Sequence, residues 1–214
     1  MRTESWSKSF FIWTGFLTAL FAVVVQLYLN IDRGGLSFIG TLINFLSFYT
    51  ILTNILIMVC YAALLFGHEG RISAFFERPV TQTALMINIF VVGAIYNVVL
   101  RSLWAPEGLQ WIVNELLHAF NPVWFLLFWL LFTDKRNMPS GQLLSWLLYP
   151  ATYLVYTLVR GSFTGWYPYP FVNITQLGLG RVLLNCVAIT AFFLILFLLS
   201  IAVGRAATRR QKTN

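Results

Sequence analysis

The stretch LINFLSFYTILTNILIMVCYAALLF, residues 42–66, decides the class of fold. It carries no charged side chain and exceeds the roughly 20 helical residues that cross the hydrocarbon core of a bilayer. A helix is the one local structure that satisfies all of its backbone hydrogen bonds by itself in lipid. The run is also too long for a strand of a membrane barrel. We therefore expect a transmembrane helix here.

Five further apolar runs of spanning length flank this one, at about 10–29, 80–100, 111–132, 142–160 and 179–204. Of the 214 residues, 59% are hydrophobic and 10% are charged. Soluble domains have about 25% charged residues, so the composition excludes a soluble globular fold and a disordered chain. We predict an all-α integral membrane bundle of six transmembrane helices, with residues 1–214 forming a single domain.

The net charge of +7 is interpreted as a topology signal, not as a nucleic-acid site. If the N-terminus is cytoplasmic, ten basic residues lie on the inner side: Arg2, Lys8, Arg71, Arg78, Lys135, Arg136, Arg205, Arg209, Arg210 and Lys212. Four lie on the outer side or at outer helix ends: Arg33, Arg101, Arg160 and Arg181. Because basic residues collect on the cytoplasmic side, both termini are predicted to be cytoplasmic.

Metal and cofactor chemistry have little support in the sequence. Cys60 and Cys186 lie inside apolar runs, which is typical of buried free thiols. The two histidines, His68 and His118, fall on a connection and on a span, without metal-ligand spacing. No glycine-rich phosphate loop and no GxSxG elbow is present. We expect no metal, no cofactor and no nucleic-acid partner.

Polar side chains inside the spans are the candidate site residues, because such groups are costly in lipid and face the bundle interior. In the second span, Ser47, Thr50 and Asn54 share one helix face, and Asn44 and Thr53 lie nearby. The functional interpretation is a site on this face. The alternative is hydrogen bonding between packed helices.

The fourth span carries Asn114, Glu115, His118 and Asn121. Glu115 precedes His118 by three residues and is its neighbour across one turn. A carboxylate beside an imidazole sets its tautomer and raises its basicity, although a lone buried histidine is commonly structural. Counted from the expected helix ends, Thr50 and His118 both lie about 10–12 Å deep. They meet if the second and fourth spans pack together.

Basic and aromatic residues gather in the outer half of the predicted bundle. They are Arg101, Arg160 and Arg181, with Tyr156 and Asn185 nearby. Such a cluster suits the carboxylate or phosphate head group of an amphiphile, while snorkelling of each arginine to the interface is the alternative. The uncharged, aromatic connection over 161–178 is either an interfacial segment or a lid over this side.

Three segments resemble a six-helix membrane family: NFLSFYTILTNIL at 44–56, His118 with Pro122, and WYPYPF at 166–171. The family includes androgen-induced gene protein, androgen-dependent TFPI-regulating protein and bacterial relatives, and this chain looks most like the bacterial branch. The animal members are intramembrane threonine hydrolases of fatty acid esters of hydroxy fatty acids. The resemblance implies Thr50 as nucleophile, with Thr53 as second choice, and His118 as base. It also implies a bacterial inner-membrane location.

Three functions remain open from the sequence. The first is an intramembrane hydrolase acting on a lipid or amphiphilic ester, with Thr50 and His118 catalytic. Supporting roles then fall to Glu115, Asn114, Asn44, Asn54 and Asn185, and head-group binding to Arg101, Arg160, Arg181 and Tyr156. The second is a transporter or channel for a small anion or lipid, which requires polar residues through the whole bilayer. The third is a non-catalytic membrane scaffold.

Overall fold

The structure is a computed structural model that describes residues 2–67, 70–135 and 143–212. Every regular element in these residues is helical. Five helical runs are long and apolar enough to cross a membrane: Trp6–Asp32, Tyr49–Phe66, Pro79–Leu103, Gly108–Phe132 and Leu179–Ala206. The all-helical prediction is therefore confirmed for the described residues, and the five runs are consistent with an integral membrane protein.

The chain divides into two compact units, Met1–Asp134 and Lys135–Asn214. The expectation of one domain over residues 1–214 stays a prediction. The fifth predicted span falls in the second unit, on a helix of 22 residues. Its tyrosines, Pro150 and Arg160 make it more polar than the five runs above, and it is not among them. The count of six spans therefore also stays a prediction.

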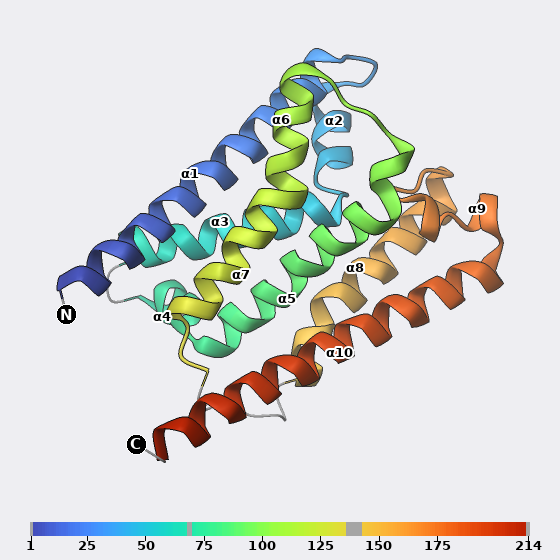
Figure 1. The fold of residues 1–214 in the computed structure, drawn as a ribbon. Coiled ribbons are helices and arrows are strands. Elements are labelled where there is room, and N and C mark those ends of the chain that lie inside the picture. Colours follow the sequence, from blue (N-terminus) through green and yellow to red (C-terminus); the bar gives the residue numbers. More distant parts are fainter. Residues whose placement is uncertain (1, 68–69, 136–142, 213–214) are drawn as a thin grey trace. The chain divides into compact units, whose positions relative to one another are not determined.

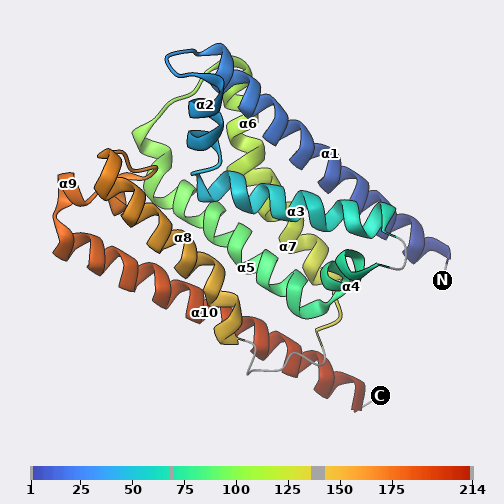
Figure 2. The same ribbon diagram turned by 180° about the vertical axis from the view of Figure 1, so that it is seen from behind.

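Long helical runs pack side by side in the first unit (Figures 1 and 2). They are α1 (Arg2–Asp32), α3 (Tyr49–Phe66), α5 (Pro79–Ile95) and the run from α6 (Gly108–Glu115) to α7 (Asn121–Phe132). The short helix α4 (Arg71–Glu77) precedes α5. Helix α3 lies between α1 and α5 and contacts both of them. The second span thus occupies the interior of the unit, in keeping with the buried polar side chains that it carries.

The predicted unbroken helix over 42–66 is wrong. Helix α2 (Phe38–Phe45) ends inside this run, and α3 begins only at Tyr49, in a different direction (Figure 2). Between them, the Ser47 hydroxyl donates to the Ile43 carbonyl at 2.6 Å and Phe48 is extended, with φ −88° and ψ 126°. A serine side chain that bonds local backbone competes with the helical ladder. The first turn of α3 is consequently a helix start inside the apolar run.

Two π turns interrupt the third and fourth spans. Residues Tyr96–Leu100 (η1) follow α5, and residues Leu116–Phe120 (η3) join α6 to α7. A short 3-10 turn, η2 (Arg101–Leu103), ends the third span. The turns η1 and η3 contact each other. Since π turns are rare and concentrate at functional sites, this pair marks where a site is to be sought.

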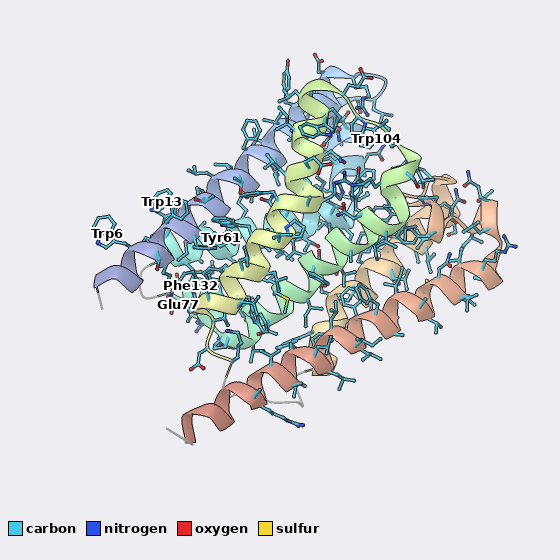
Figure 3. The ribbon with its side chains drawn as sticks, in the orientation of Figure 1. Trp6, Trp13, Tyr61, Glu77, Trp104 and Phe132 are labelled. Carbon is cyan, nitrogen blue, oxygen red and sulfur yellow. The ribbon has the colours of Figure 1, made fainter. Side chains whose placement is uncertain are left out.

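Small residues on α1 let it approach α3 closely. Gly15, Ala19 and Ala22 recur at helical spacing on its buried face, the pattern by which membrane helices bring their backbones together. The Tyr61 ring of α3 fills the space over Gly15. Trp6 and Trp13 project from α1 away from the Tyr61 ring (Figure 3). The close contact between α1 and α3 therefore depends on the missing side chain at position 15.

Replacing Gly15 with alanine is expected to destabilise the protein by about 1–3 kcal/mol, because it overpacks a full interior. A Cβ there would lie 2.4 Å from two ring atoms of Tyr61, which is only 1% exposed. Gly180→Ala is the matched control, since no atom beyond its chain neighbours and the backbone of its own helix lies within 4 Å of its added Cβ. Thermal unfolding in detergent measures both variants. An unfolding temperature for Gly15→Ala equal to that of the control would contradict the packing argument.

The second unit contains α8 (Leu143–Thr164), η5 (Pro170–Val172), α9 (Ile174–Leu177) and α10 (Leu179–Lys212). The connection between α8 and α10 packs against its own helices. The Tyr167 ring occupies the place of a side chain at Gly161, where an added Cβ would lie 2.0 Å from the ring. The Trp166 ring lies 4.4 Å from the Arg160 guanidinium, within cation–π range. This connection is therefore an ordered segment of the second unit.

Candidate functional site

The start of α3 lies against η3, and this contact brings the two candidate catalytic segments together. Thr50, in the first turn of α3, is buried. One nitrogen, Asn54 Nδ2, donates both to the Thr50 carbonyl at 2.9 Å and to the Leu117 carbonyl at 3.2 Å. Leu117 immediately precedes His118. The second and fourth spans are therefore in contact, with the backbone at Thr50 beside the backbone next to His118.

Local chain chemistry explains why η3 forms at this point. Pro122 has no N–H, so it leaves a carbonyl one turn earlier without its usual donor. The Asn121 N–H instead reaches five residues back to the Leu116 carbonyl, as in a π turn. The Leu117 carbonyl, passed over by Asn121, accepts from Asn54. The irregular turn is thus stabilised by a side chain from α3.

The His118 imidazole is held on one nitrogen and on one face. Its Nδ1 lies 3.0 Å from the Asn114 carbonyl. A carbonyl oxygen only accepts, so Nδ1 carries the proton and Nε2 keeps its lone pair. The Tyr96 ring stacks on the imidazole at 4.0 Å between centroids, with 24° between planes. The Tyr96 hydroxyl in turn accepts from Asn114 Nδ2 at 2.7 Å. This arrangement leaves Nε2 as the proton acceptor.

Glu115 forms an ion pair with Arg101 and no hydrogen bond with the imidazole among the described residues. Its Oε2 lies 2.7 Å from Arg101 Nη2 in an ion pair whose side chains are 25% and 45% exposed, respectively. Arg101 also donates from Nε to Asn97 Oδ1 at 2.9 Å, and its guanidinium lies 5.6 Å from the Tyr96 ring centre. The imidazole is therefore oriented by the main-chain carbonyl of Asn114 and not by the Glu115 carboxylate. Arg101 and Glu115 largely neutralise each other.

Asn97 connects the two π turns. Its Nδ2 donates to the Gly93 carbonyl at 2.8 Å and to the His118 carbonyl at 3.1 Å. The backbones come this close because position 93 is glycine: an added Cβ would lie 2.9 Å from Pro122 Cβ. The sequence alone does not assign this contact to Asn97 or the stacking to Tyr96. A sequence feature that bears on this contact is Pro122, because a proline disturbs the backbone one turn earlier.

Asn54 is fully buried, and its amide is fully used. Both N–H donors are engaged by carbonyls, and its Oδ1 accepts from Asn121 Nδ2 at 2.9 Å. In this arrangement, Asn54 joins α3 to the fourth span. Asn44 lies in α2, before the break, and its carbonyl accepts from the Ser47 N–H at 3.0 Å. Thr53, on α3, is completely buried.

The break before Tyr49 gives Thr50 a different setting from mid-helix. The ladder of α3 opens with the Leu52 N–H donating to the Phe48 carbonyl at 3.1 Å. Thr50 and Ile51 come before Leu52 and lie in the first turn of α3. A helix start carries partial positive charge. The Tyr49 hydroxyl donates to Asn88 Oδ1 on α5 and so anchors this start.

The remaining predicted residues belong to the second unit. Arg160 stacks on Trp166, Arg181 is exposed, and Tyr156 is 41% exposed. Asn185 Nδ2 donates to the Phe171 carbonyl at 2.8 Å and so ties the connection to α10. Their participation in the site around His118 stays a prediction.

Within residues 2–67, 70–135 and 143–212, no three His, Cys, Asp or Glu side chains are grouped in a way that could hold a metal ion. Comparison with known protein families, characterised proteins and solved structures gave no match to this chain.

Proposed function

We propose that this protein is an intramembrane hydrolase of lipid esters, with Thr50 as nucleophile and His118 as general base. The observation that supports this most is the contact of the α3 start with η3, where Asn54 Nδ2 joins the carbonyls of Thr50 and Leu117. The bond from His118 Nδ1 to the Asn114 carbonyl leaves Nε2 to accept a proton. The resemblance of residues 44–56 and of His118 with Pro122 to threonine hydrolases agrees with this assignment.

In the proposed reaction, Thr50 Oγ attacks the ester carbonyl while His118 Nε2 takes the hydroxyl proton. The tetrahedral intermediate collapses, the C–O bond to the leaving alcohol breaks, and the imidazolium returns the proton to that alcohol. His118 then deprotonates a water molecule, which attacks the acyl-threonine. The fatty acid leaves, and Thr50 recovers its proton.

The first turn of α3 supplies the proposed stabilisation of the oxyanion. The partial positive charge at a helix start favours developing negative charge. Thr50 lies in the first turn of α3, so the proposed nucleophile lies at the positive end of the dipole of this helix. Asn54 is not assigned this role, because both of its N–H donors bond carbonyls.

The polar groups in the proposed inner half of the first unit pair with one another. Trp129 Nε1 donates to Thr83 Oγ1 at 2.8 Å, and Thr133 Oγ1 donates to Gln82 Oε1 at 2.8 Å. Gln82 Nε2 completes the set with a bond to the Phe76 carbonyl at 3.0 Å. Such pairs join helices in lipid. They favour the hydrolase over a carrier whose path crosses the whole bilayer.

We further propose that α8 is a sixth span and that both termini face the cytoplasm of a bacterium, in its inner membrane. The excess of basic residues on that side supports this orientation of the protein in the membrane. Arg101, Arg160, Arg181 and Tyr156 then lie toward the outer side, where they bind the head group of an amphiphilic ester. Alkaline phosphatase fused after residue 214 is expected to be inactive, and fused within the connection between the first and second spans, active. The reverse pattern would refute the orientation.

The test of the nucleophile is labelling of the purified protein in detergent with a fluorophosphonate probe, which loses fluoride to an activated hydroxyl. Wild type is expected to be labelled, and Thr50→Ala is expected to lose labelling because the attacking oxygen is gone. Thr53→Ala is the matched control, one turn along the same helix, and is expected to keep it. Full labelling of Thr50→Ala, or none of folded wild type, would reject the proposal.

A further inference from the structure

Asn97 belongs to η1, and its side chain reaches across to η3. Within its own run it bonds the Gly93 carbonyl, and across the helix contact it bonds the carbonyl of His118 itself. In a regular helix, the His118 carbonyl would accept from the N–H four residues later. Position 122 is proline and has no N–H. The amide of Asn97 thus supplies a hydrogen bond that the backbone of this turn lacks.

The orientation of the Asn97 side-chain amide is set by the hydrogen bond to its oxygen, Oδ1. Arg101 Nε donates to Asn97 Oδ1 at 2.9 Å, so the NH₂ group turns toward the two carbonyls. Arg101 is in turn bound to Glu115, one turn before His118 on the same helical run. The chain of contacts begins and ends on the fourth span and passes through η1. These bonds therefore hold the segment that carries His118 at two points, the Glu115 side chain and the His118 carbonyl.

We propose that Asn97 is a positioning residue for His118, oriented by the ion pair of Arg101 with Glu115. It holds the π turn in the geometry in which Nδ1 reaches the Asn114 carbonyl and Tyr96 covers the ring. Without the Asn97 amide, the His118 carbonyl loses this donor. The peptide group then reorients, and the imidazole is displaced with its backbone. The inference deepens the proposed hydrolase function and rests on it for the effect on reaction rate alone.

The test measures the imidazole directly. The chain has two histidines, so His68→Gln leaves His118 as the single imidazole in a ¹⁵N-histidine spectrum of the protein in detergent micelles. With Asn97 in place, the two ring nitrogens are expected to show one Nδ1–H tautomer. Asn97→Ala and Asn97→Leu, the latter close to asparagine in shape, are expected to give a mixture of tautomers. Both are also expected to slow fluorophosphonate labelling of Thr50 about tenfold or more, since a displacement of about 1 Å can cost about 100-fold.

Gln82→Ala is the matched control. It removes a buried amide from α5, one that bonds a carbonyl and a threonine hydroxyl far along the same helical run from Asn97. It is expected to lower the unfolding temperature while leaving the tautomer and the labelling rate unchanged.

The outcomes separate the two proposals. An unchanged His118 tautomer in folded Asn97→Ala and Asn97→Leu overturns the positioning role, whatever the labelling rate. Failure of both variants to fold where Gln82→Ala folds overturns it too, because the amide is then a general structural contact. A changed tautomer in a protein whose Thr50 is never labelled supports the positioning of His118 and rejects the hydrolase.

Discussion

His118→Ala is expected to slow acylation of Thr50 by about 10²–10⁴-fold, the usual contribution of a general base. The imidazole has Nδ1 occupied by the Asn114 carbonyl, and Nε2 is the atom that takes the threonine proton. The measurement is the second-order rate of fluorophosphonate labelling in detergent, followed by the rate of hydrolysis of a long-chain ester. The loss is expected to appear in the maximal rate and not in the affinity for the probe.

Two variants separate the base from the fold around it. His118→Asn keeps an N–H that can reach the Asn114 carbonyl but has no basic nitrogen, so it is expected to be as slow as His118→Ala. His68→Ala removes the other histidine of the chain and is expected to react at the wild-type rate. A His118→Asn variant with wild-type labelling would exclude His118 as the base.

Asn54→Ala is expected to destabilise the protein by about 2–4 kcal/mol, the largest stability loss from one polar side chain of the first unit. The substitution leaves the Leu117 carbonyl and Asn121 Nδ2 without their partner in an interior where Asn54 is 0% exposed. An unsatisfied buried group costs about 1–3 kcal/mol. The unfolding temperature in detergent is expected to fall by roughly 5–15 °C.

The control for this prediction is Asn30→Ala. Asn30 accepts a bond of 2.9 Å from Gln26 on the same helix and is only half-buried, so its loss is expected to cost less than about 1 kcal/mol. Because Asn54 also joins the segments of Thr50 and His118, its alanine variant is expected to lose labelling in the fraction that remains folded. Equal unfolding temperatures for the Asn54 and Asn30 variants would contradict the central place given to Asn54.

The amino-acid sequence by itself determined that the chain is helical and rich in spanning segments. This information is local: an apolar run of sufficient length has no other stable structure in lipid. The sequence also identified the polar faces, because their members recur at helical spacing. His118 with Asn114 and the pair of Thr50 with Asn54 were found in this way.

The tertiary structure decided which of these polar groups bind each other. The expected partner of His118 was Glu115, three residues away, yet that carboxylate bonds Arg101 and the imidazole bonds the Asn114 backbone. The donor to the Leu117 carbonyl comes from Asn54, 63 residues earlier. Helical spacing predicts which residues share a face of one helix. It does not predict which other helix supplies a hydrogen-bond donor to that face.

The break before Tyr49 and the two π turns were likewise beyond the sequence pattern. No charged residue, glycine or proline interrupts residues 42–66, so the sequence pattern predicts one helix there. Irregular backbone is stable in a membrane protein only where neighbouring groups satisfy its freed N–H and carbonyl groups. Asn54 and Asn97 satisfy freed carbonyls of η3 from other helices. Ser47 and Pro122 locally favour two of these irregularities, and packing in the folded unit supplies the donors for the carbonyls that η3 frees.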